Sequence, residues 1–330
     1  MAKKEYITNK KVLVTGGAGF IGSNLCENLL QNGNTVVCLD NFSTGKEENI
    51  RSLKENPNFV LIEGDIRNLD TCHRAVKDAD VVMHQAALGS VPRSINDPIT
   101  SNDVNVSGFL NVLVATRDAK IKRFVYACSS STYGDSEELP KVEEKIGKPL
   151  SPYAVTKYVN ELYADVFAKL YGIETIGLRY FNVYGRRQDP FSTYSAVIPI
   201  FVSKIINGQA ITINGDGGFS RDFTHVDNVV LANNLAATTS SQGAINQIYN
   251  VACGEQTSLN ELAQTLIENL SQFDKNFENS KIIYGPQRAG DVPHSKASIE
   301  KIRSFLKYEP ILRFKEGVAE ACRWYWENIK

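Results

Sequence analysis

Residues 11–23 read KVLVTGGAGFIGS, and this stretch decides the fold that we expect. Its apolar first half predicts a buried strand, and a helix is predicted to follow from residue 20. Between them stand three glycines at G-x-x-G-x-x-G spacing, namely Gly16, Gly19 and Gly22. Such glycines permit a tight turn and let the backbone approach a pyrophosphate, which the N–H groups of the helix N-terminus can then bind. The stretch therefore predicts a dinucleotide site, and a plain strand-to-helix turn is the alternative.

Similar apolar runs recur through the first half of the chain and alternate with segments of helical length, such as 20–32 and 103–119. The runs are rich in Val, Ile and Phe, and most are bounded by Gly, Asn or Asp. They lie at residues 35–40, 58–65, 80–87, 123–130 and 174–183. This β-α-β order predicts an α/β fold with a Rossmann-type doubly wound parallel sheet, in which ligands bind beyond the carboxyl ends of the strands.

The regular alternation of strands and helices ends after residue 183, where Gly, Pro and Ser become frequent. Helices are predicted at about 198–207 and 226–239 with a strand at 210–217 between them, and QIYNVACG (247–254) resembles a further core strand. We therefore predict two domains. A dinucleotide-binding domain would comprise residues 1–182 and 225–253, and a smaller discontinuous α/β substrate domain would comprise residues 183–224 and 254–330.

The composition argues against several classes of protein. The chain has 330 residues, with 36 basic and 37 acidic side chains and a net charge of −1, which predicts neither a nucleic-acid surface nor a basic membrane patch. No apolar stretch is long enough to span a bilayer or to act as a signal peptide, so we expect a cytoplasmic protein. The six cysteines are scattered and only four histidines are present, which predicts reduced thiols and no metal site.

Asp40 ends the second predicted strand, 18 residues beyond Gly22. A carboxylate there can accept hydrogen bonds from the ribose hydroxyls of adenosine and would repel a 2′-phosphate. The cofactor is therefore predicted to be NAD rather than NADP, and a turn residue at a strand end is the alternative. His84, at the end of the fourth strand, is expected to be structural.

The segment SPYAVTKYVNELYA (151–164) predicts a helix. Its ends carry suitable residues, namely Ser151 as N-cap, Pro152 at the first position and Gly172 at the C-terminal end. Apolar residues recur in one stripe, at 155, 158, 159, 162, 163, 166 and 170. We expect this stripe to pack on the core, which would place Tyr153 and Lys157 together on the opposite face, one turn apart.

Tyr153 and Lys157 suit proton transfer. A free tyrosine has a pKa of about 10, and a nearby ammonium and a positively charged nicotinamide would both favour the ionised phenol. Ser129, in CSSSTYG at the end of the fifth strand, could share the proton, with Ser130 and Ser131 as competitors. The alternatives are an idle surface pair for Tyr153 and Lys157 and a plain turn for the serines.

Together, GGAGFIGS, Asp40, SSSTYG, YAVTK and RYFNVYG resemble the extended short-chain dehydrogenase/reductase family, and within it the nucleotide-sugar 4-epimerases. The resemblance covers nearly the whole chain. The segments AALGSVPRSINDP, CSSSTYGDSEELPKVEE, GRRQDP and RAGDVPHS look most like bacterial UDP-N-acetylglucosamine 4-epimerases. The resemblance implies a catalytic set in which Tyr153 is the base, Ser129 shares its proton, and Lys157 lowers its pKa and binds the nicotinamide ribose.

The resemblance also implies two groups of binding residues. The NAD site would be formed by Gly16, Gly19, Phe20, Ile21, Gly22, Asp40, Asn41, Asp65, Ile66, Gln85, Ala86, Ala87, Asn105, Tyr153, Lys157 and Tyr180. The UDP-sugar site would be formed by Gly89, Ser90, Ser129, Ser130, Ser131, Tyr153, Asn182, Gln188, Ala196, Val197, Thr212, Asn214, Arg221, Arg288, Asp291 and Ser295. Within it, Arg221 and Arg288 would hold the diphosphate and Asp291 the uridine ribose, a task that suits bidentate guanidinium groups.

Two positions depart from the galactose epimerases of the family. Where those often carry a lysine and a large side chain, this chain has Gly89 and Ser295. The smaller Ser295 should leave space for an N-acetyl group at C2 of the sugar, and a small residue in a turn is the alternative.

The implied activity is the interconversion of UDP-GlcNAc and UDP-GalNAc through a transient 4-keto sugar and bound NADH, in the supply of surface polysaccharide. Alternative substrates are UDP-glucose with UDP-galactose, or UDP-N-acetyl-hexosaminuronates, whose carboxylate could meet Arg93, or Arg186 with Arg187. A 4,6-dehydratase is less favoured because Ser130 and Ser131 stand where that class has an Asp-Glu pair.

A non-catalytic NAD-binding regulator would be expected to have lost Tyr153 or Lys157, and both are present. A homodimer is expected, because the apolar faces of the helices at 103–119 and 151–171 exceed what one sheet needs to cover.

Overall fold

The structure, a computed structural model, describes residues 6–191, 195–287 and 293–329. Within these residues, seven parallel strands form one sheet in the order β11-β6-β5-β4-β1-β2-β3. The strands are β1 (Lys11–Thr15), β2 (Thr35–Asp40), β3 (Phe59–Glu63), β4 (Val81–His84), β5 (Arg123–Ser129), β6 (Glu174–Tyr180) and β11 (Gln247–Val251). The strand order reverses between β1 and β4, which confirms the predicted doubly wound fold.

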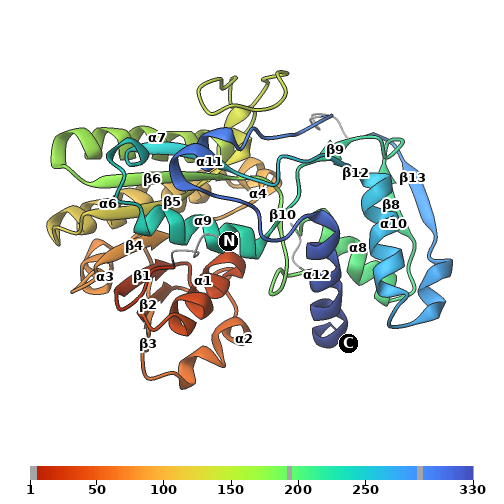
Figure 1. Ribbon diagram of the computed structural model, residues 1–330, viewed down its shortest axis with the longest axis horizontal. Coiled ribbons are helices and arrows are strands. Elements are labelled where there is room, and N and C mark those ends of the chain that lie inside the picture. The colour runs from red at the N-terminus through yellow and green to blue at the C-terminus, as the bar shows by residue number, and fades with distance from the viewer. Residues whose placement is uncertain (1–5, 192–194, 288–292, 330) are drawn as a thin grey trace.

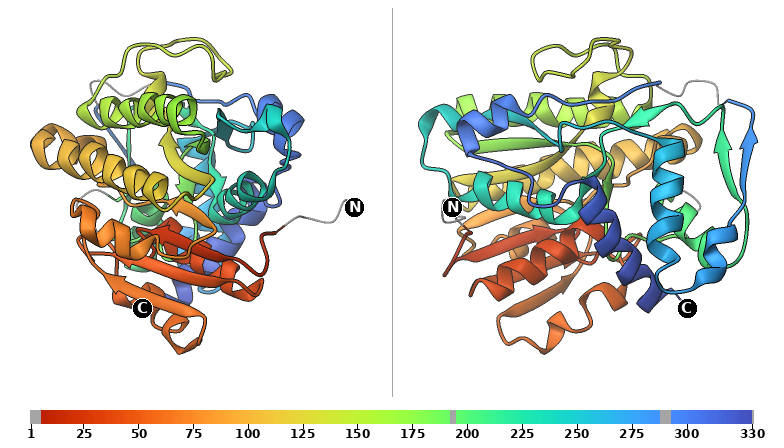
Figure 2. Two further views of the ribbon diagram at one scale, coloured as in Figure 1. Left: turned by 90° about the vertical axis from the view of Figure 1, so that its left-hand side faces the viewer. Right: turned by 45° about the vertical axis from the view of Figure 1, so that its right-hand side comes forward.

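Helices cover both faces of this sheet (Figures 1 and 2). One face is covered by α1 (Phe20–Gln31), α9 (Val226–Thr238) and α11 (Glu300–Leu306). The other is covered by α3 (Leu69–Ala75), α6 (Phe109–Asp118) and α7 (Pro152–Tyr171). Alternation along the strands supplies both cores, because Val12 and Val14 pack on the first face while Leu13 packs on the second.

The connections of the large sheet contain several short elements. They are α2 (Glu47–Ile50), α4 (Val91–Asn96), α5 (Pro98–Asn102), a π-helical stretch at Asp103–Gly108 that continues into α6, and 3₁₀ turns at Leu53–Glu55, Ser130–Tyr133 and Gln242–Ala244. The six cysteines are all buried and free, as their scattered positions predict. Among the described residues, no helix has both the length and the apolar character needed to cross a membrane.

A second core lies beside the sheet, at the right of Figure 1. It is formed by α8 (Val197–Ile206), β8 (Ile211–Asn214), α10 (Leu259–Leu270), the 3₁₀ turn Lys275–Asn279, β13 (Ile282–Gly285) and α12 (Phe314–Asn328). Short strands connect the two parts, namely β7 (Val183–Tyr184), β9 (Ser220–Arg221), β10 (Thr224–His225) and β12 (Thr257–Ser258). Residues between 297 and 308 join the core of the large sheet, although the predicted division assigns them to the smaller domain.

Helix α7 has the predicted ends but the opposite packing face. The Ser151 hydroxyl accepts a hydrogen bond from the Ala154 amide, and Gly172 is left-handed. The buried residues include Thr156, Lys157, Asn160, Glu161, Ala164 and Phe167. The predicted packing stripe is instead the outer face, where Val155, Leu162, Val166 and Leu170 are 45–68% exposed. The prediction was wrong because the polar residues of the inner face find partners on the sheet, such as the ion pair of Glu161 with Arg179.

Candidate active site

A cleft of about 370 Å³ lies at the carboxyl ends of the strands. The residues predicted to hold the cofactor line it with one exception, Asn105. Four residues predicted to meet the sugar also line it, namely Gly89, Ser129, Tyr153 and Asn182. The structure therefore brings the glycine loop and the predicted catalytic residues into one cavity.

The glycine loop requires its glycines for steric reasons. Gly16 has a φ of +69°, and a Cβ there would lie 2.7 Å from the Ala86 amide nitrogen. A Cβ at Gly22 would lie 2.0 Å from the Gly16 carbonyl oxygen. Gly19 is extended and forms the N-cap of α1 without a side chain, so the first turn of the helix faces the cleft with backbone amides. This cradle fits a pyrophosphate group.

Asp40 supports the glycine loop as well as lining the cleft. One of its carboxylate oxygens accepts the Ala18 amide at 2.9 Å, and the other accepts the Phe42 amide at 2.8 Å. Each oxygen keeps a second lone pair, which the predicted contacts to ribose hydroxyls would use. Farther along the cleft, Asp65 is held by Asn41 and Arg67, which lower the pKa of its carboxyl to about 2.

Tyr153, Lys157 and Ser129 meet in the cleft, the first two from α7 and the third from the end of β5. Burial raises the pKa of the Tyr153 phenol, and a hydrogen bond with the Ser129 hydroxyl partly offsets that rise. Burial lowers the pKa of Lys157 to about 8, and its ammonium donates to the Ala127 carbonyl at 2.9 Å. The phenol of the cofactor-free protein is therefore protonated at neutral pH.

The serine run forms a 3₁₀ turn capped by its first member. The Ser129 hydroxyl accepts the Ser131 amide at 3.2 Å and the Ser131 hydroxyl at 2.9 Å. Ser129 lines the cleft and reaches Tyr153, whereas Ser130 and Ser131 do not line it. This geometry favours Ser129 among the three serines for sharing the proton.

Asn105 supports the cleft through a neighbour, whereas Tyr180 lines the cleft itself. Asn105 is buried in the π-helical stretch, and its side chain holds both the amide and the carbonyl of Leu88, which lines the cleft. The Tyr180 hydroxyl donates to Gln85 and accepts from Asn233. The prediction that Asn105 and Tyr180 contact NAD remains a prediction.

His84 is structural, as expected. Its Nδ1 lies 2.9 Å from the Thr15 hydroxyl, and its ring packs against Phe109 and Phe124. Burial lowers its pKa to about 3, with a further contribution from Lys157. The imidazole is therefore neutral over the physiological range.

Among the described residues, the other predicted sugar and uridine residues do not line the 370 Å³ cleft. Arg288 and Asp291 fall outside the described residues. Ala196 is the N-cap of α8, Val197 begins that helix, and Thr212 and Asn214 lie on β8. Ser90 caps α4, and Gln188 donates to the Val183 carbonyl. Their contacts with a nucleotide sugar stay predictions.

Arg221 and Ser295 lie on neighbouring segments. The Arg221 guanidinium donates to the carbonyl oxygens of Ser220 and Pro293. The Ser295 amide donates to the same Ser220 carbonyl at 3.0 Å. Two residues predicted from separate motifs are thus brought together, although 74 positions separate them in the sequence.

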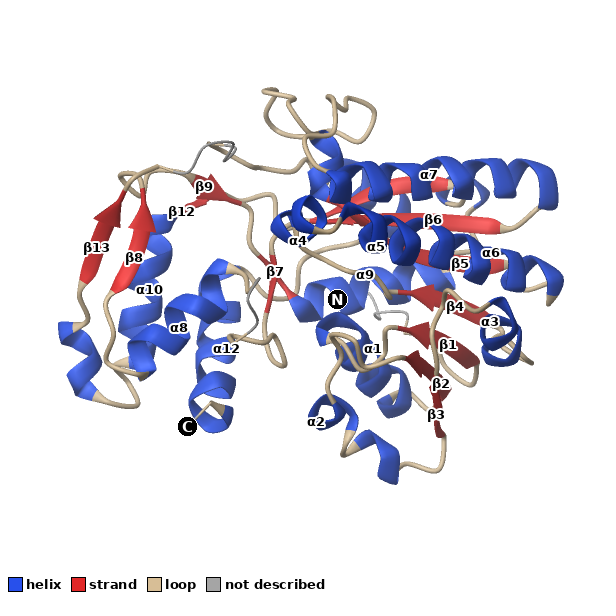
Figure 3. Cartoon of the chain, turned by 180° about the vertical axis from the view of Figure 1, so that it is seen from behind, coloured by secondary structure: helices blue, strands red, loops and turns tan. Residues whose placement is uncertain are grey.

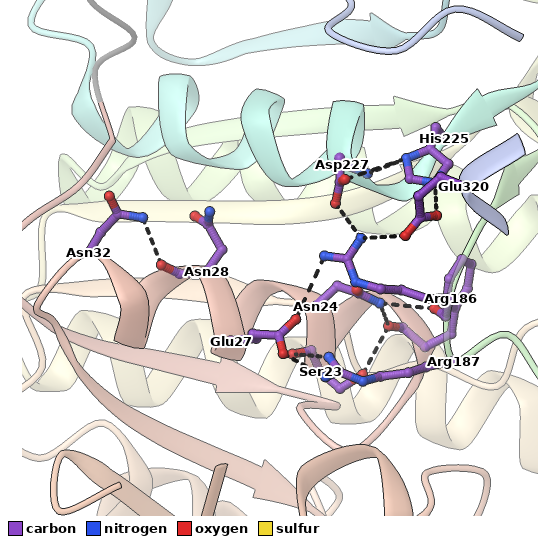
Figure 4. A network of polar contacts seen from close by, with 11 residues as sticks. Ser23, Asn24, Glu27, Asn28, Asn32, Arg186, Arg187, His225, Asp227 and Glu320 are labelled. Carbon is purple, nitrogen blue, oxygen red and sulfur yellow. Dashed lines mark hydrogen bonds and ion pairs between the residues drawn. The ribbon is translucent and has the colours of Figure 1, made fainter. Parts of the chain in front are cut away.

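Arg186 and Arg187 are engaged in ion pairs (Figure 4). Arg187 pairs with Glu27 at 2.8 Å, and Arg186 pairs with Asp227 at 2.7 Å and with Glu320 at 3.6 Å. These contacts join α1, α9 and α12 to the loop after β7. Both arginines are therefore paired with carboxylates of the protein itself.

Sequence reasoning missed some of the lining of the cleft, namely Leu39, Ser43, Thr44, Gly64, Leu88, Val104, Ala127, Cys128 and Val183. Ser43 and Thr44 lie three and four residues beyond Asp40, the last residue of β2, and that position beyond a carboxyl end is the signal that could have found them. Val104 comes from the π-helical stretch and carries no comparable signal.

Residues 12–252 match the NAD dependent epimerase/dehydratase family. The chain belongs to this family. The predicted resemblance is thereby confirmed, and NAD is the cofactor of the family. The glycine cradle and the cleft fit that cofactor.

Known members are similar over nearly their whole length. A putative UDP-glucose 4-epimerase of Methanocaldococcus jannaschii is 39% identical over 319 residues, which cover 96% of this chain and 99% of the relative. The structure of UDP-N-acetylglucosamine 4-epimerase from Methanobrevibacter ruminantium M1 in complex with UDP-N-acetylmuramic acid has a TM-score of 0.90 and 36% identity, covering 97% of this chain and 99% of that one.

The structure of UDP-glucuronic acid 4-epimerase from Bacillus cereus in complex with UDP-glucuronic acid and NAD has a TM-score of 0.85 and 31% identity, covering 96% of this chain and 99% of that one. The three relatives share an epimerase name and differ in the sugar. Similarity therefore assigns the chain to the UDP-sugar 4-epimerase group and does not select its sugar.

Proposed function

We propose that this protein is a UDP-N-acetylglucosamine 4-epimerase that interconverts UDP-GlcNAc and UDP-GalNAc. The observation that carries the proposal is the meeting of Tyr153, Ser129 and Lys157 in a cleft that also contains the glycine loop. NAD, when bound, supplies the reversible hydride acceptor for C4 of the sugar. The glycine loop and Asp40 would hold its pyrophosphate and ribose.

Tyr153 would accept the proton of the sugar O4 hydroxyl, with Ser129 as the relay. The phenol must ionise for this, and burial raises its pKa in the protein alone. A cationic ring beside it and the Lys157 ammonium would favour the ionised form. Lys157, with a pKa of about 8, is protonated at pH 7 and can provide that charge.

The N-acetyl preference is supported by room in the cleft. A Cβ built at Gly89 meets no atom within 4 Å, and this glycine does not have a positive φ. Packing and backbone strain therefore do not require a glycine there, and its small size leaves space at the edge of the cleft. Ser295, the other small residue, is half-buried beside the Arg221 segment.

The uronate alternative loses two of its candidate residues, because Arg186 and Arg187 already pair with Glu27, Asp227 and Glu320. Arg93 stays a candidate for meeting a sugar carboxylate. Epimerisation of UDP-glucose and UDP-galactose stays the other alternative, since a roomy site also admits a sugar without the acetyl group. The 4,6-dehydratase alternative stays less favoured, for want of an acidic pair after Ser129.

We also propose that the protein is a homodimer through the outer faces of α6 and α7, which lie side by side in Figure 3. The exposed stripe Val155, Leu162, Val166 and Leu170 supports this, since it is a contiguous apolar helix face. Sedimentation of the purified protein would test the proposal. The cytoplasmic location stays a prediction.

The function is tested by incubating the purified protein, without added cofactor, with UDP-GlcNAc, UDP-Glc and the corresponding uronates in parallel. The expected result is conversion of UDP-GlcNAc to UDP-GalNAc at a kcat/KM above that of the other sugars. Preferred conversion of a uronate or of UDP-Glc would refute the proposed sugar. A 4-keto-6-deoxy product would refute the epimerase reaction itself.

A further inference from the structure

Asp222 is a buried carboxylate at a junction of separate chain segments. Its side chain is fully buried, and its oxygens accept the amides of Cys253, Gly254 and Ala297 at 3.0, 3.0 and 3.2 Å. Within the part of the chain that the structure describes, the hydrogen bonds to this carboxylate all come from backbone amides. Asp222 therefore fixes main-chain positions rather than pairing with a cation.

Two of the segments that Asp222 joins carry predicted nucleotide-sugar residues, namely Arg221 and Ser295. Cys253 and Gly254 follow β11, the edge strand of the large sheet. Ala297 belongs to the segment 293–298, which runs beside Ser220 through the bonds of the Ser220 amide to Pro293 and of the Ser295 amide to Ser220. The arrangement places Arg221, which directly precedes Asp222, at the contact between these segments.

The main chain of Asp222 also reaches the cofactor cleft. Its carbonyl oxygen accepts the side-chain amide of Asn182 at 3.0 Å, and Asn182 lines the cleft with a φ of +35°. One residue thus connects β9, the end of β11, the segment 293–298 and the wall of the cleft.

A stabilising role alone does not account for this carboxylate. Removing an ion from water is costly unless a partner charge compensates it. The three amide donors offset only part of the cost of burying the charge, because the pKa of Asp222 stays raised to about 7, with burial as the main cause. A residue that destabilises its own ionised form is typical of a position kept for function rather than for stability.

We propose that Asp222 is a positioning residue for the nucleotide sugar: its carboxylate fixes the spacing between Arg221 and the segment 293–298 and ties both to the end of β11. Asp222 does not line the cleft, so it acts through these segments and not on the sugar. The inference rests on the proposed function for the place where the UDP group binds.

The test compares Asp222→Asn with the wild-type protein. The amide keeps the size of the side chain but turns an NH₂ group toward amide donors that need an acceptor. We expect the Kd of UDP, measured by calorimetry, and the KM of UDP-GlcNAc to rise about tenfold or more. The kcat and the bound NAD per subunit should change less than about threefold, because Tyr153 and the glycine loop do not contact Asp222.

Glu143→Gln is the matched control. Glu143 is another buried carboxylate that binds a backbone amide, that of Asn250 near the end of β11, at 2.8 Å. This variant should lose stability and keep the wild-type affinity for UDP. Equal losses of UDP affinity in both variants, at matched folded fractions, would show a merely structural role and overturn the inference.

The pH dependence of the wild-type KM keeps the inference testable if Asp222→Asn does not fold. UDP-GlcNAc keeps a constant charge between pH 6 and 8, and protonation of Asp222 would remove an acceptor from its amides. The KM should therefore rise as the pH falls from 8 to 6. The charged groups nearby are Glu255 and its partner Arg313, while burial raises the pKa values of Cys253 and Tyr308 and keeps both neutral.

His294 also lies near these segments, bonded to the Ser220 hydroxyl. A KM that is constant or falls toward pH 6 would overturn the inference. A wild-type protein that binds neither UDP nor UDP-GlcNAc would instead refute the proposed function, whereas tight UDP binding that Asp222→Asn leaves unchanged would refute the positioning role alone.

Discussion

Around the glycine loop, backbone packs against backbone: Gly16 lies against Gln85 and Ala86, and Gly22 lies against Gly16. Around Arg221, in contrast, a side chain bonds to main chain that is distant in the sequence, because the Asp222 carboxylate accepts amides 31, 32 and 75 positions away. The cofactor side is built by neighbouring βα units, whereas the predicted nucleotide-sugar side is assembled from distant pieces. A substitution that adds bulk should therefore disrupt the cofactor side. Loss of a hydrogen-bond acceptor should disrupt the nucleotide-sugar side.

Gly22→Ala should disrupt the cofactor side itself, because it breaks the backbone contact on which that side is built. Its Cβ would lie 2.0 Å from the Gly16 carbonyl oxygen, and only a shift of the turn can relieve that clash. We expect NAD binding to weaken by roughly 100-fold or more. The measurement is the amount of NAD released from the purified protein on denaturation. Gly243→Ala is the control, since its Cβ would meet only the Phe305 ring at 3.5 Å, and a Gly22→Ala protein with full NAD content would contradict the prediction.

Tyr153→Phe should abolish most of the turnover while leaving both sides of the site assembled. The variant removes the group that exchanges the proton, which costs roughly 10²- to 10⁴-fold in kcat. Bound NAD and the Kd of UDP should stay within about twofold of the wild-type values, because the ring remains. Tyr158→Phe on the same helix is the control, since Tyr158 does not line the cleft. Retention of more than a tenth of the wild-type kcat by Tyr153→Phe would show that another group is the base.

The same contrast explains how much the sequence could predict. The sheet, the glycine loop and the ends of α7 follow from local patterns, because a strand, a turn and a helix cap each carry their own signal. The inner face of α7 could not be predicted, since Lys157 and Glu161 are buried through Ala127 and Arg179. Periodicity locates an apolar stripe, but it does not say whether the sheet or a partner subunit covers it.

On the nucleotide-sugar side, the role of Asp222 could not be predicted from the sequence. The family resemblance implies a diphosphate-binding role for Arg221 and gives no role to its neighbour Asp222. The role of Asp222 depends on amides that come together only in the folded chain. An aspartate next to an arginine in the sequence can be a surface ion pair or a buried acceptor of backbone amides, and no local pattern distinguishes the two.

The pH dependence of the free energy of unfolding should report on the buried carboxylate of Asp222. The folded-state pKa of Asp222 is about 7, above the value of about 4 for an unfolded aspartate, so its contribution to stability is full below pH 4 and is lost as the pH rises through 7. We expect the free energy of unfolding of the wild type to fall by about 3 kcal/mol relative to Asp222→Asn between pH 5 and 8. Urea titrations at each pH measure this difference. Stability and sugar affinity should then move in opposite directions with pH, and a constant difference between the two proteins would contradict the assignment.

Glu27→Gln should have the smallest effect. It tests whether ion pairs couple the cofactor side of the site to the nucleotide-sugar side. Glu27 on α1 pairs with Arg187 at 2.8 Å and with Arg186 at 3.7 Å, and Arg186 continues to Glu320 on α12 (Figure 4). The cluster is partly buried, so loss of the charge should lower the free energy of unfolding by about 1 kcal/mol, an effect that shrinks in 1 M salt.

Glu47→Gln is the matched control for this cluster. Glu47 pairs with Lys54 at the same 2.8 Å, but both side chains are exposed, and the pair connects only neighbouring turns of the chain. If Glu27→Gln lowers stability no more than Glu47→Gln does, the cluster is only a surface contact. If it also raises the KM of UDP-GlcNAc while NAD content holds, the ion pairs transmit position from the first helix of the cofactor side to the pieces that Asp222 joins.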